Sequence, residues 1–212
     1  MNNSWINFST LATISSEEYL SSKPFEYYSI MNVFKEEKLK ELVKELEAYE
    51  YYIEDHDLYQ FKRTHDFKNT SSSLIKEFRN EIFSDTFVTE MERITGLSLL
   101  RDKGDLHSLK LEQTHYLLCH DDQVQDRAVA FIINLSQDWD EEDGGILELF
   151  ESDSSGNPRS VAKRIIPEFN QFNFFTVSSK SFHQISEVVS ESKSRLSISG
   201  WLYKRDRQGE GL

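Results

Sequence analysis

The clearest hydrophobic pattern in the first half of the chain is that of an amphipathic helix. Between residues 35 and 49, Leu39, Leu42, Val43 and Leu46 follow the i, i+3, i+4, i+7 spacing, while Lys and Glu fill the other positions. This spacing places the four side chains on one face of a helix and the charged side chains on the other. We therefore predict a helix here, with one buried face.

Two more helices are predicted before the pattern changes at Gly96. The serines at 71–73 can cap a helix that runs to about Phe83, because a Ser hydroxyl accepts a hydrogen bond from the first free backbone N–H groups. The next helix spans Asp85 to Thr95, and Gly96 is a suitable residue to end it. The expected buried positions of the two helices are Leu74, Ile75, Phe78, Ile82, Phe87, Val88, Met91 and Ile94.

From Gly96 onward, short apolar segments alternate with turn signals, which is typical of β-strands. The candidate strands are 106–111, 114–119, 127–135, 145–150, 162–167, 172–177, 183–185 and 195–203. Helices followed by about eight strands predict an α+β fold, a double-stranded β-helix (jelly roll) with the N-terminal helices packed on one outer face. We expect a flexible N-terminal segment (1–23), a single domain (24–203) and a charged tail (204–212).

Composition narrows the classes of partner and the compartment. The net charge of −13 argues against a nucleic-acid backbone as the direct partner and is compatible with a basic protein partner. Cys119 is the only cysteine, which excludes an internal disulfide and suits a reducing compartment. The chain has no apolar run of about 18 residues and no secretory signal pattern. We expect no membrane partner and a cytoplasmic location, or a nuclear one in a eukaryote.

The chemistry is concentrated around the segment 116–122, which reads as a strand. Alternation of side chains would place Tyr116, His120 and Asp122 on one face. An imidazole and a carboxylate two residues apart can hold one metal ion, and His183 is available as a third ligand. Two His and one carboxylate are the ligand set of non-haem Fe(II) oxygenases. The His-x-Asp pair alone would equally fit a surface turn.

Arg195 opens a strand that otherwise looks buried, and Ser197 faces the same way. A buried guanidinium needs an anionic partner, because an unpaired buried charge is costly. A carboxylate of the protein is one candidate partner. The distal carboxylate of a bound dicarboxylic acid is the other, gripped by the guanidinium and a Ser hydroxyl.

These segments together resemble the Fe(II)/2-oxoglutarate dioxygenases, and among them the eukaryotic ribosomal prolyl hydroxylases and their bacterial relatives. The resemblance extends from about Pro24 to Tyr203, and larger members of the family add a second, metal-free roll. The segments that carry it are 117–122, Trp139 with 143–145, 181–188 and 193–201.

The resemblance implies Fe(II) bound by His120, Asp122 and His183, and 2-oxoglutarate held by Arg195 with Ser197 nearby. It implies hydroxylation of a proline in a protein substrate, a ribosomal protein or a translation factor, with release of succinate and CO₂. Ascorbate is a supporting reductant in this interpretation.

The chain departs from the family at two positions near the cosubstrate. The family has a Tyr nine residues before the first His ligand and another fourteen after it, where this chain has Leu111 and Asn134. Asn134 can still hydrogen bond to a carboxylate, and Tyr116 can supply a phenol unless it packs in the core. The segment containing Asp57, Tyr59 and Phe61 resembles family sequence at the substrate entrance, with simple packing as the alternative.

Two other functions stay open from the sequence. One is a non-catalytic sensor or interaction module that binds metal and 2-oxoglutarate without turnover. The other is a dioxygenase that hydroxylates a small molecule. His56, His65 and His107 have no partner at ligand spacing, and His115 alternates away from His120, so we assign these four no role. The acidic segment 138–144 is interpreted as a turn rather than a calcium loop.

Overall fold

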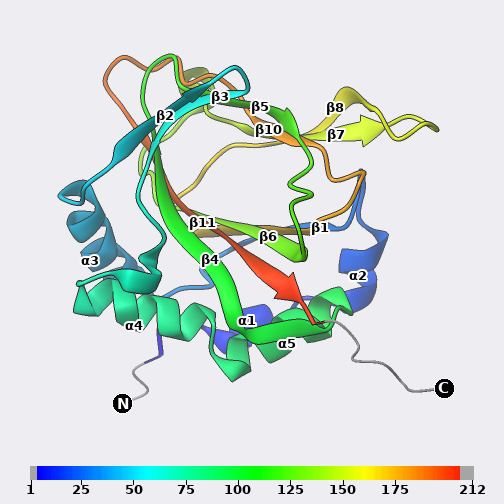
Figure 1. Cartoon of the computed structure of the whole chain (residues 1–212), viewed down its shortest axis with the longest axis horizontal. Coiled ribbons are helices and arrows are strands. Elements are labelled where there is room, and N and C mark those ends of the chain that lie inside the picture. Colours follow the sequence, from blue (N-terminus) through cyan, green and yellow to red (C-terminus); the bar gives the residue numbers. More distant parts are fainter. Residues whose placement is uncertain (1–3, 206–212) are drawn as a thin grey trace.

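The computed structural model describes residues 4–205, apart from the side chain of Asp102. Its helices gather on one side of a strongly curled sheet (Figure 1). The helices are α1 (Phe8–Leu11), α2 (Ser16–Ser21), α3 (Glu36–Glu47), α4 (Ser73–Ile82) and α5 (Asp85–Thr95), with 3-10 turns η1 (Phe67–Asn69) and η2 (Glu141–Asp143). None of the helices within 4–205 is both long enough and apolar enough to pass through a bilayer.

The three longer helices confirm the predicted ones to within two residues. Ser72 is the N-cap of α4, where its side chain accepts from the backbone N–H of Ile75. The Ser84 side chain caps α5 in the same way, and Gly96 ends that helix at φ 72°. That left-handed conformation favours glycine, which is why the helix stops there.

The N-terminal segment differs from the prediction of a flexible 1–23. In the described part, residues 4–23, Trp5, Leu11 and Tyr19 are fully buried in the core shared with the long helices. The Tyr19 hydroxyl also lies 2.9 Å from Oγ1 of Thr176 in the sheet. The segment shows no clear hydrophobic periodicity because its two helices are very short. Its apolar side chains are therefore buried individually and do not form a continuous helical face.

In the part of the chain that the structure describes, eleven strands form one antiparallel sheet. They are β1 (Tyr27–Met31), β2 (Tyr52–His56), β3 (Tyr59–Arg63), β4 (Leu99–Leu111), β5 (Tyr116–His120), β6 (Arg127–Asn134), β7 (Leu147–Ser152), β8 (Pro158–Ile165), β9 (Gln171–Thr176), β10 (His183–Ile185) and β11 (Arg195–Lys204). Their order is β1-β9-β6-β11-β4-β3-β5-β10-β7-β8, with β2 paired to β3. All eight strands predicted after Gly96 are present.

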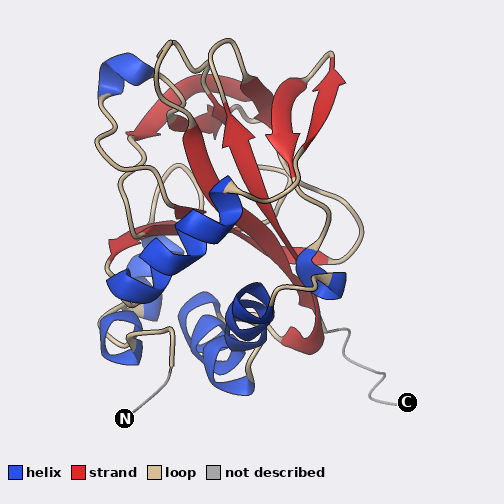
Figure 2. Ribbon diagram, turned by 90° about the vertical axis from the view of Figure 1, so that its left-hand side faces the viewer, coloured by secondary structure: helices blue, strands red, loops and turns tan. Residues whose placement is uncertain are grey.

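The sheet curls because β3 joins its two halves. One end of β3 pairs with β5 (Tyr59 with Leu117), and the other pairs with β4 (Arg63 with Leu109). The half made of β1, β9, β6, β11 and β4 carries the helices on its outer face (Figure 2). The α+β double-stranded β-helix prediction is therefore confirmed.

Alternation along three neighbouring strands separates a helix-facing core from the interior of the roll. Phe172 and Phe174 of β9 pack toward the helices, whereas Phe175 belongs to the inner apolar cluster. The same alternation on β6 and β11 turns Ala130 and Ile132 inward, and Ile198 toward the helices. The interior positions of these strands are where the polar residues of the site are found. The tail prediction concerns mostly residues 206–212, which lie outside the described residues.

Candidate active site

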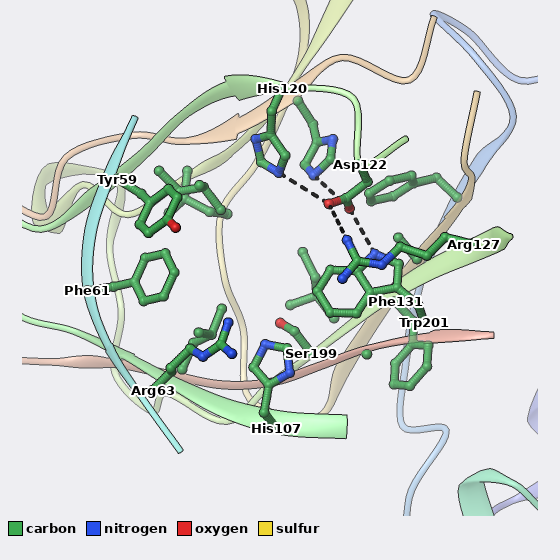
Figure 3. A pocket seen from close by; sticks show the side chains of 18 of the residues that line it. Tyr59, Phe61, Arg63, His107, His120, Asp122, Arg127, Phe131, Ser199 and Trp201 are labelled. Carbon is green, nitrogen blue, oxygen red and sulfur yellow. Dashed lines mark hydrogen bonds and ion pairs between the residues drawn. The ribbon is translucent and has the colours of Figure 1, made fainter. Parts of the chain in front are cut away.

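A cavity of about 250 Å³ opens on the inner face of the roll (Figure 3). Side chains from seven strands, β3, β4, β5, β6, β9, β10 and β11, contribute to its walls, together with Leu58 of the β2–β3 turn and Asp122 of the β5–β6 loop. His120, Asp122, His183 and Arg195, the four residues singled out from the sequence, all line it. They come from three separate segments of the chain, so only the curl of the sheet brings them together.

His120, Asp122 and His183 offer one ligand atom each, and these atoms lie within 4.8 Å of one another. Nε2 of His120 is 3.6 Å from Oδ1 of Asp122, and Nε2 of His183 is 3.6 Å from Oδ2. β5 and β10 pair directly at these positions, His120 opposite His183. This arrangement fits a two-His, one-carboxylate ion site with one side open to the cavity.

The second nitrogen of each imidazole is held by the backbone. Nδ1 of His120 donates to the Leu118 carbonyl at 2.8 Å, and Nδ1 of His183 donates to the Ser181 carbonyl at 2.9 Å. Because Nδ1 is held by a carbonyl, Nε2 is the nitrogen of each imidazole that is left to bind a metal ion beside Asp122. Backbone contacts of this kind orient metal-binding imidazoles.

Burial and mutual contact set the charge states of the cluster. Burial, with the nearby His120, lowers the pKa of His183 to about 4. Burial acts to lower the pKa of His120 too, but the hydrogen bond and charge of Asp122 outweigh it and raise that pKa. Burial would raise the pKa of Asp122, but the two imidazoles and the Trp201 N–H hold it well below its usual range. An ionised carboxylate beside a neutral His183 suits cation binding.

The position of Asp122 in the cluster does not follow from the alternation of side chains along β5. β5 ends at His120, and Asp122 follows it at φ 61°. The pairing of β5 with β10 is also irregular, since Ile185 lies opposite Leu117 while His183 lies opposite His120. The bulge shifts the alternation, so Leu117 rather than Tyr116 shares the cavity side with His120.

Asp122 has two further partners that the sequence did not reveal. Nε1 of Trp201 donates to Oδ2 at 3.1 Å, and Nη1 of Arg127 lies 3.6 Å from Oδ1. The Arg127 guanidinium is itself stacked 3.6 Å from the Trp201 ring. Both residues are predictable as strand positions but not as neighbours of Asp122, because that depends on how β6 and β11 pair.

Arg195 is 1% exposed and forms no ion pair with an acidic side chain anywhere in residues 4–205. Its Nη2 donates to Oδ1 of Asn134 at 3.0 Å and its Nη1 to the Ser197 hydroxyl at 3.4 Å. Nε has no partner among the described groups. Burial lowers the pKa of Arg195 to about 10, so the guanidinium is charged at neutral pH. An unpaired buried cation of this kind fits the carboxylate of a ligand.

A row of buried amides continues from Arg195 across two strands. Nδ2 of Asn134 donates to Oε1 of Gln171 at 2.7 Å, and Nδ2 of Asn173 donates to the same oxygen at 3.2 Å. Two donors on one oxygen fix the Gln171 amide, which turns Oδ1 of Asn134 toward Arg195. The sequence predicted a role for Asn134 alone. Polar residues at inward positions of an aromatic strand were the available signal for Gln171 and Asn173.

Two other features close the site around Arg195. Leu111 is paired with Arg195 across β4 and β11 and is buried. Gly145 has φ 63°, and a Cβ there would lie 2.9 Å from Cδ of Arg195. The Gly144-Gly145 turn is therefore required for close approach as well as for its backbone conformation.

The remaining candidate residues divide into two groups. Tyr59 and Phe61 line the cavity and stack with ring centroids 5.0 Å apart. Tyr116 is not among the cavity-lining residues, for the reason given by the β5 bulge, and the exposed Asp57 in the β2–β3 turn is not among them either. Conversely, His107 lines the cavity although the sequence gave no reason to select it.

The chain matches the model of the 2OG-Fe(II) oxygenase superfamily over residues 106–203. It is 40% identical over 185 residues to the prolyl 3-hydroxylase OGFOD1 of Mus musculus, covering 87% of this chain and 34% of that protein. It is 33% identical over 189 residues to the prolyl 3-hydroxylase sudestada1 of Drosophila melanogaster, covering 86% and 35%. The chain thus spans about a third of the length of these relatives.

Solved structures show the same fold at low identity. A prolyl-4-hydroxylase from Pseudomonas putida superposes with a TM-score of 0.73 at 16% identity, covering 92% of this chain and 99% of that one. A prolyl hydroxylase from Trichoplax adhaerens, in complex with a hypoxia inducible factor peptide fragment, gives 0.70 at 14% identity, covering 92% and 89%. The sequence match, the fold and the His120–Asp122–His183 cluster all indicate Fe(II) as the metal and 2-oxoglutarate as the cosubstrate. The chain belongs to the 2OG-Fe(II) oxygenase superfamily and is related to the prolyl 3-hydroxylases of the OGFOD1 and sudestada1 group.

Proposed function

We propose that this chain is a prolyl hydroxylase that acts on a protein, with Fe(II), O₂ and 2-oxoglutarate as reactants. The observation that carries the proposal is one cavity containing both the His120–Asp122–His183 cluster and the unpaired Arg195. The overall reaction adds one oxygen atom of O₂ to a proline and the other to 2-oxoglutarate, which becomes succinate and CO₂. Bound Fe(II) supplies the oxygen activation for this chemistry.

The protein residues hold and orient the reactants. His120, Asp122 and His183 bind the metal in this proposal, and the open side of their cluster faces the cavity. Arg195 and Ser197 bind the distal carboxylate of 2-oxoglutarate, with Asn134 hydrogen bonded to the guanidinium. Tyr116 is not part of the proposed cosubstrate site, because the β5 bulge turns its neighbour Leu117 toward the cavity instead.

The cavity mouth supports a peptide substrate. Leu58 and Leu118 are 56% and 43% exposed at the mouth, and the Leu118 N–H donates to the Leu58 carbonyl at 2.8 Å. The stacked Tyr59 and Phe61 rings continue this apolar surface inward. Apolar and aromatic surface suits a proline ring, which has no N–H to donate. Asp57 lies in the adjoining turn, at the rim.

A ribosomal protein or a translation factor is the substrate that the family resemblance supports. The net charge of −13 agrees with a basic protein of this kind as the partner. A reducing compartment such as the cytoplasm suits the single thiol, Cys119.

The test measures succinate formation by the purified protein with Fe(II), 2-oxoglutarate, ascorbate and extracts of ribosomal proteins. Hydroxyproline is located in those proteins by mass spectrometry. Turnover that is lost in His183→Ala and retained in His65→Ala, an exposed histidine outside the cavity, supports the proposal. Binding of Mn²⁺ and 2-oxoglutarate without any succinate would instead indicate a sensor module. Turnover with free amino acids, and none with proteins, would indicate a small-molecule dioxygenase.

A further inference from the structure

Two buried polar side chains on the cavity floor have no hydrogen-bond partner among residues 4–205. His107 of β4 is 6% exposed, Ser199 of β11 is 7% exposed, and the two residues pair directly across the strands. Both line the cavity, on the wall opposite His120 and Asp122 (Figure 3). Within residues 4–205, neither side chain takes part in a hydrogen bond.

Such a pair is unusual in a folded interior. Most buried polar groups are hydrogen bonded, and the cavity is the side from which His107 and Ser199 can still take a partner. Packing accounts for part of the position of His107, since its ring lies 5.4 Å from that of Trp201 at an interplanar angle of 31°. Packing does not account for two adjacent unpartnered polar groups directed into the same cavity. A ligand atom that bonds to both would.

The charges around His107 and Ser199 indicate what kind of ligand atom would bind to both side chains. Arg63 and Arg127 both line the cavity, on either side of His107 (Figure 3). Burial, together with these two cations, lowers the pKa of His107 to about 3 despite the opposing effect of Asp122. The imidazole is therefore neutral at physiological pH and can donate one N–H. Two hydrogen-bond donors in a positive field favour an oxygen acceptor.

The position of Ser199 along β11 indicates which ligand oxygen it contacts. Arg195, Ser197, Ser199 and Trp201 occupy successive inward positions of this strand. Ser197 contacts Arg195 at one end, and Trp201 contacts Asp122 at the other. A dicarboxylic acid that extends from Arg195 to the metal ligands must therefore pass Ser199 and its neighbour His107.

We propose that His107 and Ser199 form a second oxygen-binding site for 2-oxoglutarate, at the end of the molecule nearer the metal, where both side chains donate to its keto-acid oxygens. This inference rests on the proposed function. It assigns His107 and Ser199 as binding residues that complement Arg195 at the opposite end of the cosubstrate.

The experiment compares His107→Leu, His107→Gln and Ser199→Ala, with His65→Leu as the matched histidine control. The dissociation constant of 2-oxoglutarate is measured by calorimetry on the Mn²⁺-loaded protein, where no turnover occurs. The visible charge-transfer absorption of the anaerobic Fe(II)–2-oxoglutarate complex is recorded in parallel. A purely structural role of His107 would leave this band unchanged, whereas a lost hydrogen bond to a chelating oxygen shifts it.

We expect His107→Leu to weaken 2-oxoglutarate binding about tenfold, the equivalent of one hydrogen bond. Ser199→Ala weakens it by a similar or smaller factor, His107→Gln restores most of the affinity, and His65→Leu has no effect. Ser199→Ala decides the question alone if His107→Leu fails to fold. If the wild type binds 2-oxoglutarate, and the variants have dissociation constants within twofold of the wild-type value and an unshifted absorption band, this inference alone is overturned. Wild-type protein that binds no 2-oxoglutarate would overturn the proposed function as well.

Discussion

The indole N–H of Trp201 donates to Oδ2 of Asp122 at 3.1 Å, and this single contact links the last strand of the sheet to the metal-binding cluster. It holds the carboxylate by one oxygen and leaves Oδ1 directed toward Nε2 of His120, 3.6 Å away. Because Asp122 lies beyond the end of β5 at φ 61°, its position is not determined by strand pairing. Trp201 therefore orients this carboxylate, acting as a positioning residue.

Trp201→Phe keeps an aromatic ring but removes the donor. We expect about a tenfold loss of Mn²⁺ affinity, since removing an outer hydrogen bond to a metal ligand typically costs 10–100-fold. Electron paramagnetic resonance titration of free Mn²⁺ measures it directly. An unchanged affinity in a variant with wild-type thermal stability would show that Asp122 is oriented by other contacts.

Arg195→Met removes the buried guanidinium and keeps a side chain of similar length. The expected result is a rise of about 100-fold in the 2-oxoglutarate dissociation constant, because charge-assisted hydrogen bonds contribute roughly 1.5–3 kcal/mol each. Mn²⁺ affinity should stay within about threefold of wild type, since Arg195 forms no hydrogen bond or ion pair with the three metal ligands. Parallel calorimetric titrations of metal and cosubstrate separate the two effects, and a loss of both affinities would contradict the assignment.

Gln171→Leu tests the amide row. Without Oε1 of Gln171, the Nδ2 groups of Asn134 and Asn173 lose their common acceptor. We expect the free energy of unfolding to fall by about 1–3 kcal/mol, as for a buried donor left unpaired, and 2-oxoglutarate binding to weaken several-fold as Asn134 turns. Urea unfolding and ligand titration measure the two quantities. Gln171→Glu is the informative control, because it keeps the acceptor but places a negative charge near Arg195.

The buried His107 predicts a dependence of stability on pH. Its pKa is about 3 in the folded chain and 6.5 when exposed, so the unfolded chain binds more protons between these values. Stability should therefore fall as the pH decreases below 6.5, by about 1.4 kcal/mol per pH unit for one histidine. Urea unfolding of metal-free protein at several pH values measures the slope. His183, with a pKa of about 4, adds to it in the same direction.

The matched comparison is His107→Gln, which removes the titrating group. Its profile should be flatter than that of the wild type by about one proton over this pH range. Parallel profiles would show that His107 is hydrated or protonated in the folded protein, contrary to its burial in the structure.

The sequence alone predicted the three longer helices, the eight strands after Gly96 and the fold class, and it selected the four residues that the structure brings to one cavity. Helical stripes such as that of Leu39 to Leu46 arise from local spacing, and the segments around His120, His183 and Arg195 are long motifs. Local periodicity and contiguous motifs need no knowledge of how distant strands pair, which is why these features could be predicted.

Only the tertiary structure decided what surrounds those residues. Because of the bulge in β5, Leu117 lines the cavity and Tyr116 does not. Strand register places Gln171 opposite Asn134 and His107 opposite Ser199. A shift of one residue in any of these pairings would turn each side chain to the opposite face of the sheet. Register is set by packing across the whole roll, so neither the amide row nor the cavity floor can be inferred from neighbouring residues in the chain.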